Sequence, residues 1–518
     1  MSTYFLTTAI DYANGDPHVG HAYEKIGADA IARYRRLRGD DVHFLIGMDE
    51  HGQKVEQTAA QQGVAPQALV DDLAARFAAM WLRLGISNDQ FMRTTDAMHR
   101  VGVQALIERI FDRSPDDFYE KAYEGWYCVG CEAFKGDAEI VDGKCVLHPT
   151  RTLEWVEERN WFFRLSKYTE FLRDLLTNNA QFLQPESRRN EMLALIERGL
   201  EDVSASRSRL TWGIPFPRPL SSGERQTTYV WFDALPNYLT ATGFPVPSGS
   251  ATWPAQLHIV GKDITRFHTI IWPAMLQAAG LPLPERVWGH GFVLLGGERF
   301  SKSAGVRLDV DEAIDRHGAD AFRYFLLREV PFDGDGSFSF ERFDDRYNAD
   351  LANSWGNLLS RVVAMVEKYR DGVVPIGERG VADAADALDI QRYHAAMDGS
   401  RGFLLHEALQ CAMACVTRGN EYVQATQPWS IAKRTDDGAS RELDNVLASL
   451  VRQLARVTVL LAPFMPSKAQ EAWTQLGGDG SVLSMRHDLL AAFDATGLIV
   501  KKGAPLFPKV AAPPSPPA

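Results

Sequence analysis

Apolar and polar residues near the N-terminus follow two different periods, which predict a strand, a helix and a second strand. Residues 4–10 are apolar and rich in strand formers, and turn-forming residues follow at 14–17. Apolar residues then recur at helical spacing, at Tyr23, Ile26, Ala30, Ile31 and Tyr34. Another apolar run occupies residues 42–46. A strand–helix–strand unit of this length predicts a parallel sheet with a right-handed crossover.

The middle of the chain interrupts this α/β pattern. From about residue 116 to 225, a stretch with three cysteines is followed by helical segments and by the proline-rich run 213–219. Strand-like sequence resumes at residues 228–232 and 257–260. The pattern predicts one α/β domain that contains an insertion.

Beyond about residue 345, apolar residues keep a helical period almost throughout. Long helices are expected near residues 347–369, 403–423 and 443–461, which predicts a separate all-α domain. The expected domains are the first half of the α/β domain (1–115), the insertion (116–225), the second half (226–292), a linker subdomain (293–345), the helical domain (346–495) and a tail with a disordered end (496–518).

Composition and charge exclude several classes of protein. The 518 residues favour about three domains, and 45% hydrophobic with 24% charged residues is ordinary for a globular protein. No apolar run reaches the roughly 20 residues of a membrane helix, and the N-terminus does not resemble a signal peptide. Five cysteines form no disulfide framework, so we expect a cytoplasmic protein. The net charge of −12 argues against a general nucleic-acid coat protein but allows a local basic track.

Two histidines lie where the first strand should pass into a helix. His18 and His21 flank Gly20, and a helix N-terminus offers unpaired N–H groups and a positive dipole end that suit phosphate. Gly20 permits a nucleotide to approach closely. A His-x-Gly-His sequence alone is weak evidence, because two turn histidines without a ligand would look the same.

A second candidate phosphate site is the glycine-flanked loop 296–305. It carries Lys302 between Ser301 and Ser303, and such a loop can fold over a triphosphate. A surface loop without a ligand is the commoner outcome for this composition. The two motifs together are more specific than either alone, and they favour an ATP-using enzyme.

Four residues of the insertion have the spacing of a zinc site. Cys128 and Cys131 are followed, after thirteen residues, by Cys145 and His148. Three thiolates and one imidazole suit tetrahedral Zn²⁺, and four protein ligands predict a closed, structural site. The alternatives are four unrelated residues or a labile disulfide.

The pair of phosphate motifs resembles the two signatures of class I aminoacyl-tRNA synthetases, His-Ile-Gly-His and Lys-Met-Ser-Lys-Ser. Arg299 and Phe300 stand in place of the Lys and Met of the second signature, and Lys302 corresponds to its catalytic lysine. The resemblance implies that an amino-acid carboxylate attacks the α-phosphate of ATP, with Mg²⁺ on the triphosphate. His18, His21 and Lys302 would then stabilise the developing phosphate charge.

Residues 8–15, 47–52, 229–234 and 261–268 resemble the methionyl-tRNA synthetases specifically, and the likeness extends from residue 4 to about 508. The resemblance implies that methionine is bound by Ala9, Ile10, Tyr12, Asp49, Trp231, Tyr238, Asp263 and His268. Asp49 would hold the substrate ammonium, with Arg207 as its active-site partner. An apolar slot with aromatic walls suits an unbranched thioether.

The resemblance also gives the helical domain a role. It implies that Asn357, Arg361 and Trp429 read the CAU anticodon of tRNA(Met), the initiator tRNA included, by stacking and by hydrogen bonds to base edges. The insertion of about 110 residues is too short for the large editing domain of the valine, isoleucine and leucine enzymes. The extra C-terminal module that dimerises many family members is missing from this sequence, so we expect a monomer.

Two other functions explain part of the pattern. A nucleotidyltransferase that activates a free small acid would share both signatures, but would leave the helical domain without a role. A zinc-containing tRNA-binding protein with an inactive catalytic fold would not need His18, His21 and Lys302. The leading interpretation is therefore an enzyme with a Rossmann-like catalytic domain, a zinc-containing insertion and an all-α anticodon-binding domain, which joins methionine to tRNA.

Overall fold

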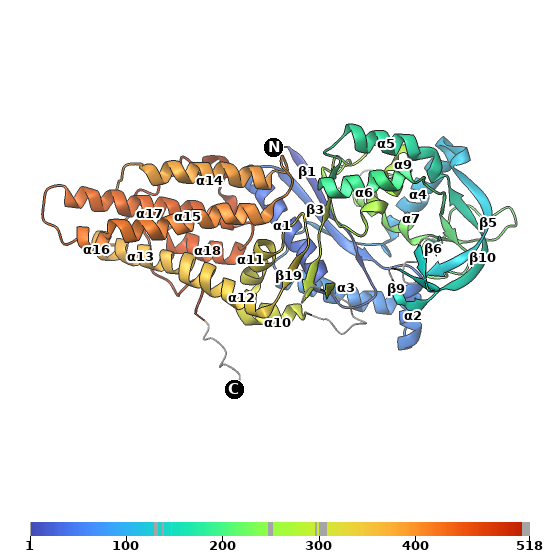
Figure 1. The fold of residues 1–518 in the computed structure, drawn as a ribbon, viewed down its shortest axis with the longest axis horizontal. Helices are drawn as coiled ribbons and strands as arrows, with labels where there is room; N and C mark the ends of the chain where they lie inside the picture. Colours follow the sequence, from blue (N-terminus) through green and yellow to red (C-terminus); the bar gives the residue numbers. More distant parts are fainter. Residues whose placement is uncertain are drawn as a thin grey trace.

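The computed structural model describes residues 2–128, 133–136, 139–146, 148–246, 252–295, 298–299 and 308–509. Three regions follow one another along the long axis of the molecule (Figure 1). The insertion lies at one end, the parallel sheet in the middle and an elongated helical bundle at the other end. The expectation of a disordered end concerns residues 510–518, which lie outside the described ranges.

The middle region is built on one parallel sheet. Its strand order is β11 (Leu183–Gln184), β16 (Val287–His290), β15 (Leu257–Gly261), β1 (Thr3–Thr8), β3 (Asp41–Asp49) and β2 (Asp11–Tyr12), and β4 (Gln90–Arg93) also pairs with β3. Every one of these strand pairs is parallel. The predicted strands at residues 4–10, 42–46 and 257–260 are confirmed, with slightly different ends. β1 lies between β3 and β15, so the sheet reverses its direction of winding there.

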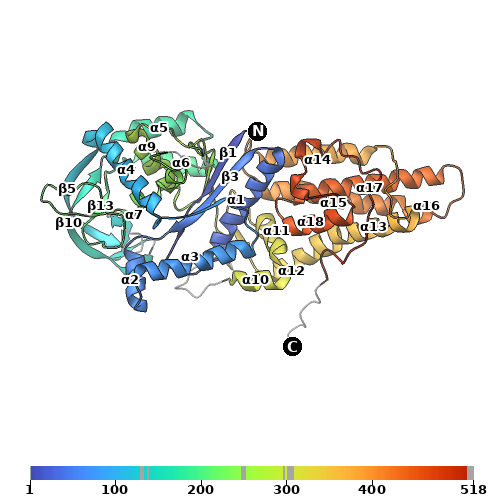
Figure 2. The same ribbon diagram turned by 180° about the vertical axis from the view of Figure 1, so that it is seen from behind.

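The first crossover is the helix α1 (Val19–Arg38). His18 caps its N-terminus, and Gly39 ends it in the left-handed conformation with φ 92°. Three arginines in the last turn suit the negative end of the helix dipole. Figure 2 shows α1 between the sheet and the helical bundle, so the helix is buried on most sides.

One predicted strand is wrong. Of residues 228–232, only the first belongs to a strand, β14 (Thr227–Thr228), and the chain then turns into the short helix α7 (Val230–Ala234). The amide groups of Phe232 and Asp233 donate to the carbonyl of Tyr229 and close that turn. Four of the five α7 residues are buried. In a short apolar run that is buried on all sides, the sequence shows no periodicity that distinguishes a strand from a helix.

The insertion has a four-stranded antiparallel sheet of its own. Its order is β12 (Val203–Ser204), β10 (Glu154–Phe163), β5 (Phe118–Cys128) and β6 (Ala133–Lys135). The helices α5 (Thr169–Asn178) and α6 (Glu186–Glu197) follow β10. Between them, β11 pairs with β16 of the central sheet, so the inserted segment also extends the α/β domain.

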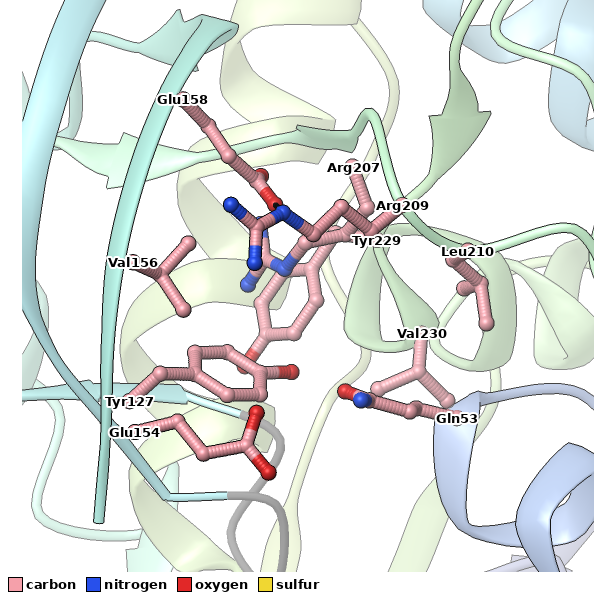
Figure 3. Close-up of a pocket in the computed structure, with 10 residues that line it drawn as sticks. All are labelled: Gln53, Tyr127, Glu154, Val156, Glu158, Arg207, Arg209, Leu210, Tyr229 and Val230. Atoms are coloured by element: carbon pink, nitrogen blue, oxygen red, sulfur yellow. Dashed lines mark ion pairs between the residues drawn. The ribbon is translucent and has the colours of Figure 1, made fainter.

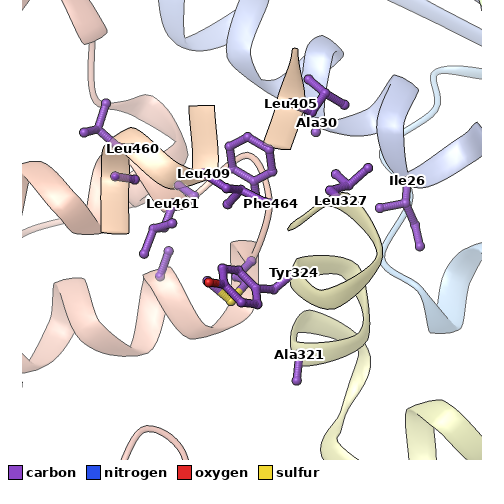
Figure 4. Close-up of a cluster of buried hydrophobic side chains, with 14 of the residues drawn as sticks. Ile26, Ala30, Ala321, Tyr324, Leu327, Leu405, Leu409, Leu460, Leu461 and Phe464 are labelled. Carbon is purple, nitrogen blue, oxygen red and sulfur yellow. The ribbon is translucent and has the colours of Figure 1, made fainter. Parts of the chain in front are cut away.

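The predicted all-α domain is confirmed. A π-helical segment (Tyr347–Gly356) continues into α13 (Asn357–Arg370), and α14 (Val381–Met397), α15 (Leu405–Thr426), α16 (Pro428–Ile431), α17 (Ala439–Leu461) and α18 (Pro466–Gln475) follow. α11 (Ala319–Glu329) joins this bundle to α1 through shared apolar packing, in which Tyr324 and Leu327 face Phe464 and Ile26 (Figure 4). No helix in the described ranges has the length and apolar character needed to cross a bilayer.

A single buried arginine reinforces the junction between the two domains. Arg323 of α11 is fully buried and donates to Asp29 of α1 at 2.6 Å. It also donates to the carbonyl oxygens of Leu84, Pro463 and Phe464. The catalytic domain and the end of α17 are therefore held by one guanidinium group.

Candidate active site

Residues predicted to bind substrate gather at one edge of the central sheet. Ala9 and Ile10 follow β1, Asp49 is the last residue of β3, and Asp263 follows β15. These are the carboxyl ends of adjacent parallel strands, beside the strand at which the winding reverses. Ligands of open α/β sheets bind at this place.

The two signature histidines stack against each other at the start of α1. Their ring centroids are 3.7 Å apart with an interplanar angle of 22°. Nδ1 of His18 accepts from the amide of Gly20, and Nδ1 of His21 accepts from the amide of His18. Each ring is therefore fixed by a backbone donor at its Nδ1 atom. A Cβ on Gly20 would lie 3.0 Å from the His18 ring, so a larger residue would disturb the pair.

The second signature lies mostly outside the described residues. Ser301, Lys302 and Ser303 belong to this part, so their predicted contacts with the triphosphate stay predictions. The preceding strand β17 (Val293–Leu295) pairs with β18 (Glu298–Arg299).

The structure brings the aromatic residues of the predicted methionine slot together. Tyr238 and His268 are both buried, and the Tyr238 hydroxyl lies 2.7 Å from His268 Nε2. His268 Nδ1 donates to the Ile264 carbonyl, so Nε2 accepts from the hydroxyl in the neutral ring. Burial lowers the pKa of His268 to about 4, which keeps the ring uncharged at neutral pH. Trp231 stacks on Phe267 at 3.7 Å, so the slot has a second aromatic layer that the sequence did not reveal.

The remaining predicted methionine residues differ in their exposure. Ala9 and Asp49 are buried, and Ile10 and Tyr12 are half-buried. Asp263 is exposed at the rim of the strand edge. Asp49 is therefore shielded from solvent, whereas Asp263 is not.

Arg207 lines a cavity between the catalytic domain and the insertion sheet (Figure 3). Its guanidinium lies 4.0 Å from the ring centroid of Tyr229 and donates to the carbonyls of Ser204 and Ser206. Tyr127 and Gln53 project into the same cavity from opposite sides. Arg207 is therefore held rigidly beside α7, and its predicted partnership with Asp49 stays a prediction.

A buried charge cluster behind the strand edge was missed in the sequence. Lys25 is fully buried and donates to the Ala9 carbonyl, Asp11 and Glu24, at 2.8–2.9 Å. His290, the last residue of β16, lies 3.1 Å from Glu24. Burial and the neighbouring Glu24 raise the pKa of Asp11 to about 7 in spite of Lys25. The signal in the sequence was the pair of charged residues 24 and 25 between the apolar Tyr23 and Ile26.

Two of the four predicted zinc ligands have side chains among the described residues. The side chains of Cys128 and Cys145 are buried in one small cluster with Leu153. The hairpin of β8 (Lys144–Cys145) and β9 (His148–Thr152) places the backbone of His148 opposite Cys145. Cys131 and the His148 side chain lie outside the described residues. Within the described residues, no group of three or more metal-ligating side chains is found.

The predicted anticodon residues lie together on the bundle. Asn357 is exposed and Arg361 half-buried on one face of α13. The Arg361 guanidinium lies 5.9 Å from the ring of Trp429 in α16. Trp429 is half-buried rather than fully exposed, because one side of its ring packs against the bundle core.

Comparisons with known proteins identify the family. The family model for class I tRNA synthetases (M) matches residues 4–153 and 139–363, and the model for the anticodon binding domain of methionyl tRNA ligase matches residues 378–512. A methionine–tRNA ligase of Caldanaerobacter subterraneus is 43% identical, over 98% of this chain and 79% of the relative. One of Thermosynechococcus vestitus is 44% identical, over 92% of this chain and 90% of the relative. The chain belongs to the methionyl-tRNA synthetase family.

A solved structure agrees with the fold along its whole length. Mycobacterium tuberculosis methionyl-tRNA synthetase in complex with methionyl-adenylate has a TM-score of 0.91 and 39% identity, and covers 98% of this chain and 100% of that chain. The predicted Rossmann-like catalytic domain and helical anticodon-binding domain are therefore confirmed. The chain is a class I ligase that activates methionine with ATP and charges tRNA with it.

Proposed function

We propose that this chain converts L-methionine and ATP to methionyl-adenylate and pyrophosphate at the carboxyl edge of the central sheet, and then transfers methionine to tRNA(Met) with release of AMP. The stacked pair of His18 and His21 at the N-terminus of α1 is the observation that supports it most directly. No enzyme nucleophile is needed, because positioning and charge stabilisation carry phosphoryl chemistry of this kind.

The phosphate end of the site consists of the two histidines, Gly20 and the Ser301–Ser303 loop, with Mg²⁺ bound to the triphosphate. Lys302→Ala is expected to slow methionine-dependent pyrophosphate exchange by a factor of 100 or more, roughly the loss of one electrostatic contact to the transition state. Methionine binding, followed by tryptophan fluorescence, should change little. An equal loss of binding would remove Lys302 from this role.

The methionine end consists of the aromatic slot and Asp49. The side chain lies among Ala9, Ile10, Tyr12, Trp231, Tyr238 and His268, with Asp49 on the ammonium, Asp263 at the entrance and Arg207 beside Asp49. Pyrophosphate exchange measured with each of the twenty amino acids tests this assignment. Strongest exchange with an amino acid other than methionine would refute it.

The insertion holds one structural zinc ion between Cys128, Cys131, Cys145 and His148. Two observations support this ligand set. Cys128 and Cys145 are buried in one cluster, and the hairpin of β8 and β9 places the His148 backbone opposite Cys145. Cys145→Ser should reduce the zinc measured by elemental analysis from about one ion per chain to near zero. Cys411→Ser, on α15, is the matched control and should retain the metal.

Asn357, Arg361 and Trp429 recognise the anticodon of both initiator and elongator tRNA(Met). The contact between Arg361 and Trp429 supports a shared surface. Trp429→Ala should lower kcat/KM for tRNA charging by roughly 10- to 100-fold, the size of one lost stacking contact, and leave exchange unchanged. Trp155→Ala, on the exposed face of the insertion, is the control.

Three broader expectations complete the proposal. The domain limits are those predicted above, and limited proteolysis should cut between them. The enzyme works in the cytoplasm. It is a monomer, for which sedimentation should give a mass near 57.7 kDa.

A further inference from the structure

A His–Asp–His network lies buried directly behind the methionine slot. Asp233 is fully buried, and its carboxylate lies 2.7 Å from His51 Nδ1 and 3.1 Å from His99 Nε2. A carboxylate only accepts hydrogen bonds, so both nitrogens carry hydrogen. The other nitrogen of His99 lies 2.8 Å from the Thr240 hydroxyl, which also donates to the Asn237 carbonyl.

The members of this network have a regular relation to the slot. Three of them lie two residues beyond a slot residue on three separate elements: His51 after Asp49, Asp233 after Trp231 and Thr240 after Tyr238. The elements are the end of β3, α7 and α8 (Asn237–Thr240), and His99 of α4 (Ala97–Arg113) connects the last two. One hydrogen-bonded chain thus joins three of the elements that carry the slot.

The network is sealed and charged. Burial alone would raise the pKa of Asp233, but the charge of His51 and the hydrogen bonds from both histidines outweigh it and lower the pKa, so the carboxylate stays ionised. His51 packs edge-on against Trp212 at 5.4 Å. The Trp212 indole N–H donates to the Glu50 carbonyl at 2.7 Å, so the segment after β3 is held from its other side as well.

We propose that Asp233 is a positioning residue for methionine, which sets the spacing between Asp49, Trp231 and Tyr238. It touches no substrate, because its side chain is fully enclosed. A slot that rejects a side chain one methylene longer must keep its walls within a fraction of an ångström, and a buried charged pair provides stiffness that apolar packing does not. This inference rests on the proposed methionine slot.

The test is Asp233→Asn, which keeps the shape and one acceptor oxygen but removes the charge and presents an amide donor to one histidine. The KM for methionine in pyrophosphate exchange should rise by roughly 10- to 100-fold, the size of one lost hydrogen bond to a charged group. The KM for ATP should stay within about 2-fold, because α1 holds the phosphates independently. The preference for methionine over ethionine should fall, because the walls are no longer fixed.

Asp117→Asn is the matched control. Asp117 is also fully buried, but it accepts from Lys167 and Tyr168 at the start of the insertion. The Asp117→Asn substitution should lower the stability of the protein and leave the KM for methionine unchanged. A variant of Asp233 that behaves like this control, or that raises both KM values together, would overturn the inference. If Asp233→Asn does not fold, Thr240→Val removes the hydroxyl, and with it the contact to His99 and the hydrogen bond to the Asn237 carbonyl. An unchanged methionine KM in that variant would overturn the inference equally.

The wild-type enzyme separates the two proposals. Exchange that does not depend on methionine would refute the proposed function itself. Methionine-dependent exchange with an Asp233 variant that resembles the control would refute only the positioning role.

Discussion

Replacing Arg323 by methionine should loosen the junction between the catalytic and helical domains. Methionine has a similar length, so the change removes the charge and four hydrogen bonds without a large cavity. The pKa of Asp29 indicates what is lost: burial would raise it, but Arg33, Arg323 and Ser87 lower it to about 2. Asp29 keeps Arg33 at 2.8 Å and the hydroxyl of Ser87.

The magnitude follows from these contacts. Breaking a buried ion pair costs about 3–5 kcal/mol. Because Asp29 keeps Arg33 as a partner, we expect a cost near the lower end, about 3 kcal/mol. The carbonyls of Pro463 and Phe464 lose their donor, and one of them left unpaired adds about 1 kcal/mol. The free energy of unfolding should therefore fall by about 4 kcal/mol, measured by urea unfolding with tryptophan fluorescence at unchanged m-value.

Two further variants make this measurement decisive. Arg434→Met removes an arginine that is paired with Asp436 and Glu442 at the surface, and should change the free energy of unfolding far less, because solvent screens exposed ion pairs. Arg323→Lys keeps the charge but not the planar group, so its stability should lie between wild type and Arg323→Met. Equal stability of the Arg323→Met and Arg434→Met variants would refute the reasoning.

Stability should also fall in mild acid, because burial lowers the pKa of His268 and His394 to about 4 and that of His487 to about 3. Their folded pKa values lie below the ordinary 6.5, so this stability is complete above pH 6.5 and is lost between pH 6.5 and about 4, by up to about 2 kcal/mol per residue at pH 5. Urea midpoints at pH 7.5 and pH 5 measure the loss, and a His487→Phe variant with an unchanged pH dependence would contradict its part in it. Lys25→Met leaves Asp11 and Glu24 buried without their cation and should lower the free energy of unfolding by about 3 kcal/mol or more at pH 7.5. The control is Lys121→Met, at an exposed position of β5, which should leave the free energy of unfolding nearly unchanged in the same urea titration.

The sequence predicted the parts of the fold that have a clear period or a distinctive spacing. The strand–helix–strand start, the interrupted α/β domain and the helical domain were all correct, because their apolar residues repeat over long segments. The family was identified because short motifs far apart in the chain carry paired chemistry. The zinc ligands and the Ser301–Ser303 loop stay predictions.

The rest could not be read from the sequence because it depends on tertiary contacts. α7 was expected to be a strand, since a short apolar run has no distinguishing period when all its sides are buried. Phe267 covers Trp231 only after the π-helical turn η4 (Phe267–Ile271) brings it there. Asp233 lies 182 residues from His51 and 134 residues from His99 along the chain. No local sequence pattern indicates that one carboxylate joins two such distant imidazoles.

The position of α1 couples two distant parts of the molecule mechanically. Its first turn holds the stacked histidines, and its later turns are clamped to the other domains through Asp29–Arg323 and through Arg35, which donates to the carbonyl of Asp398. Twenty helical residues span about 30 Å and bend little. A tilt of the helical bundle against the sheet would therefore shift the imidazoles at the far end of α1, so the proposed binding of RNA to α13 and α16 would act on the same helix that carries the proposed phosphate site.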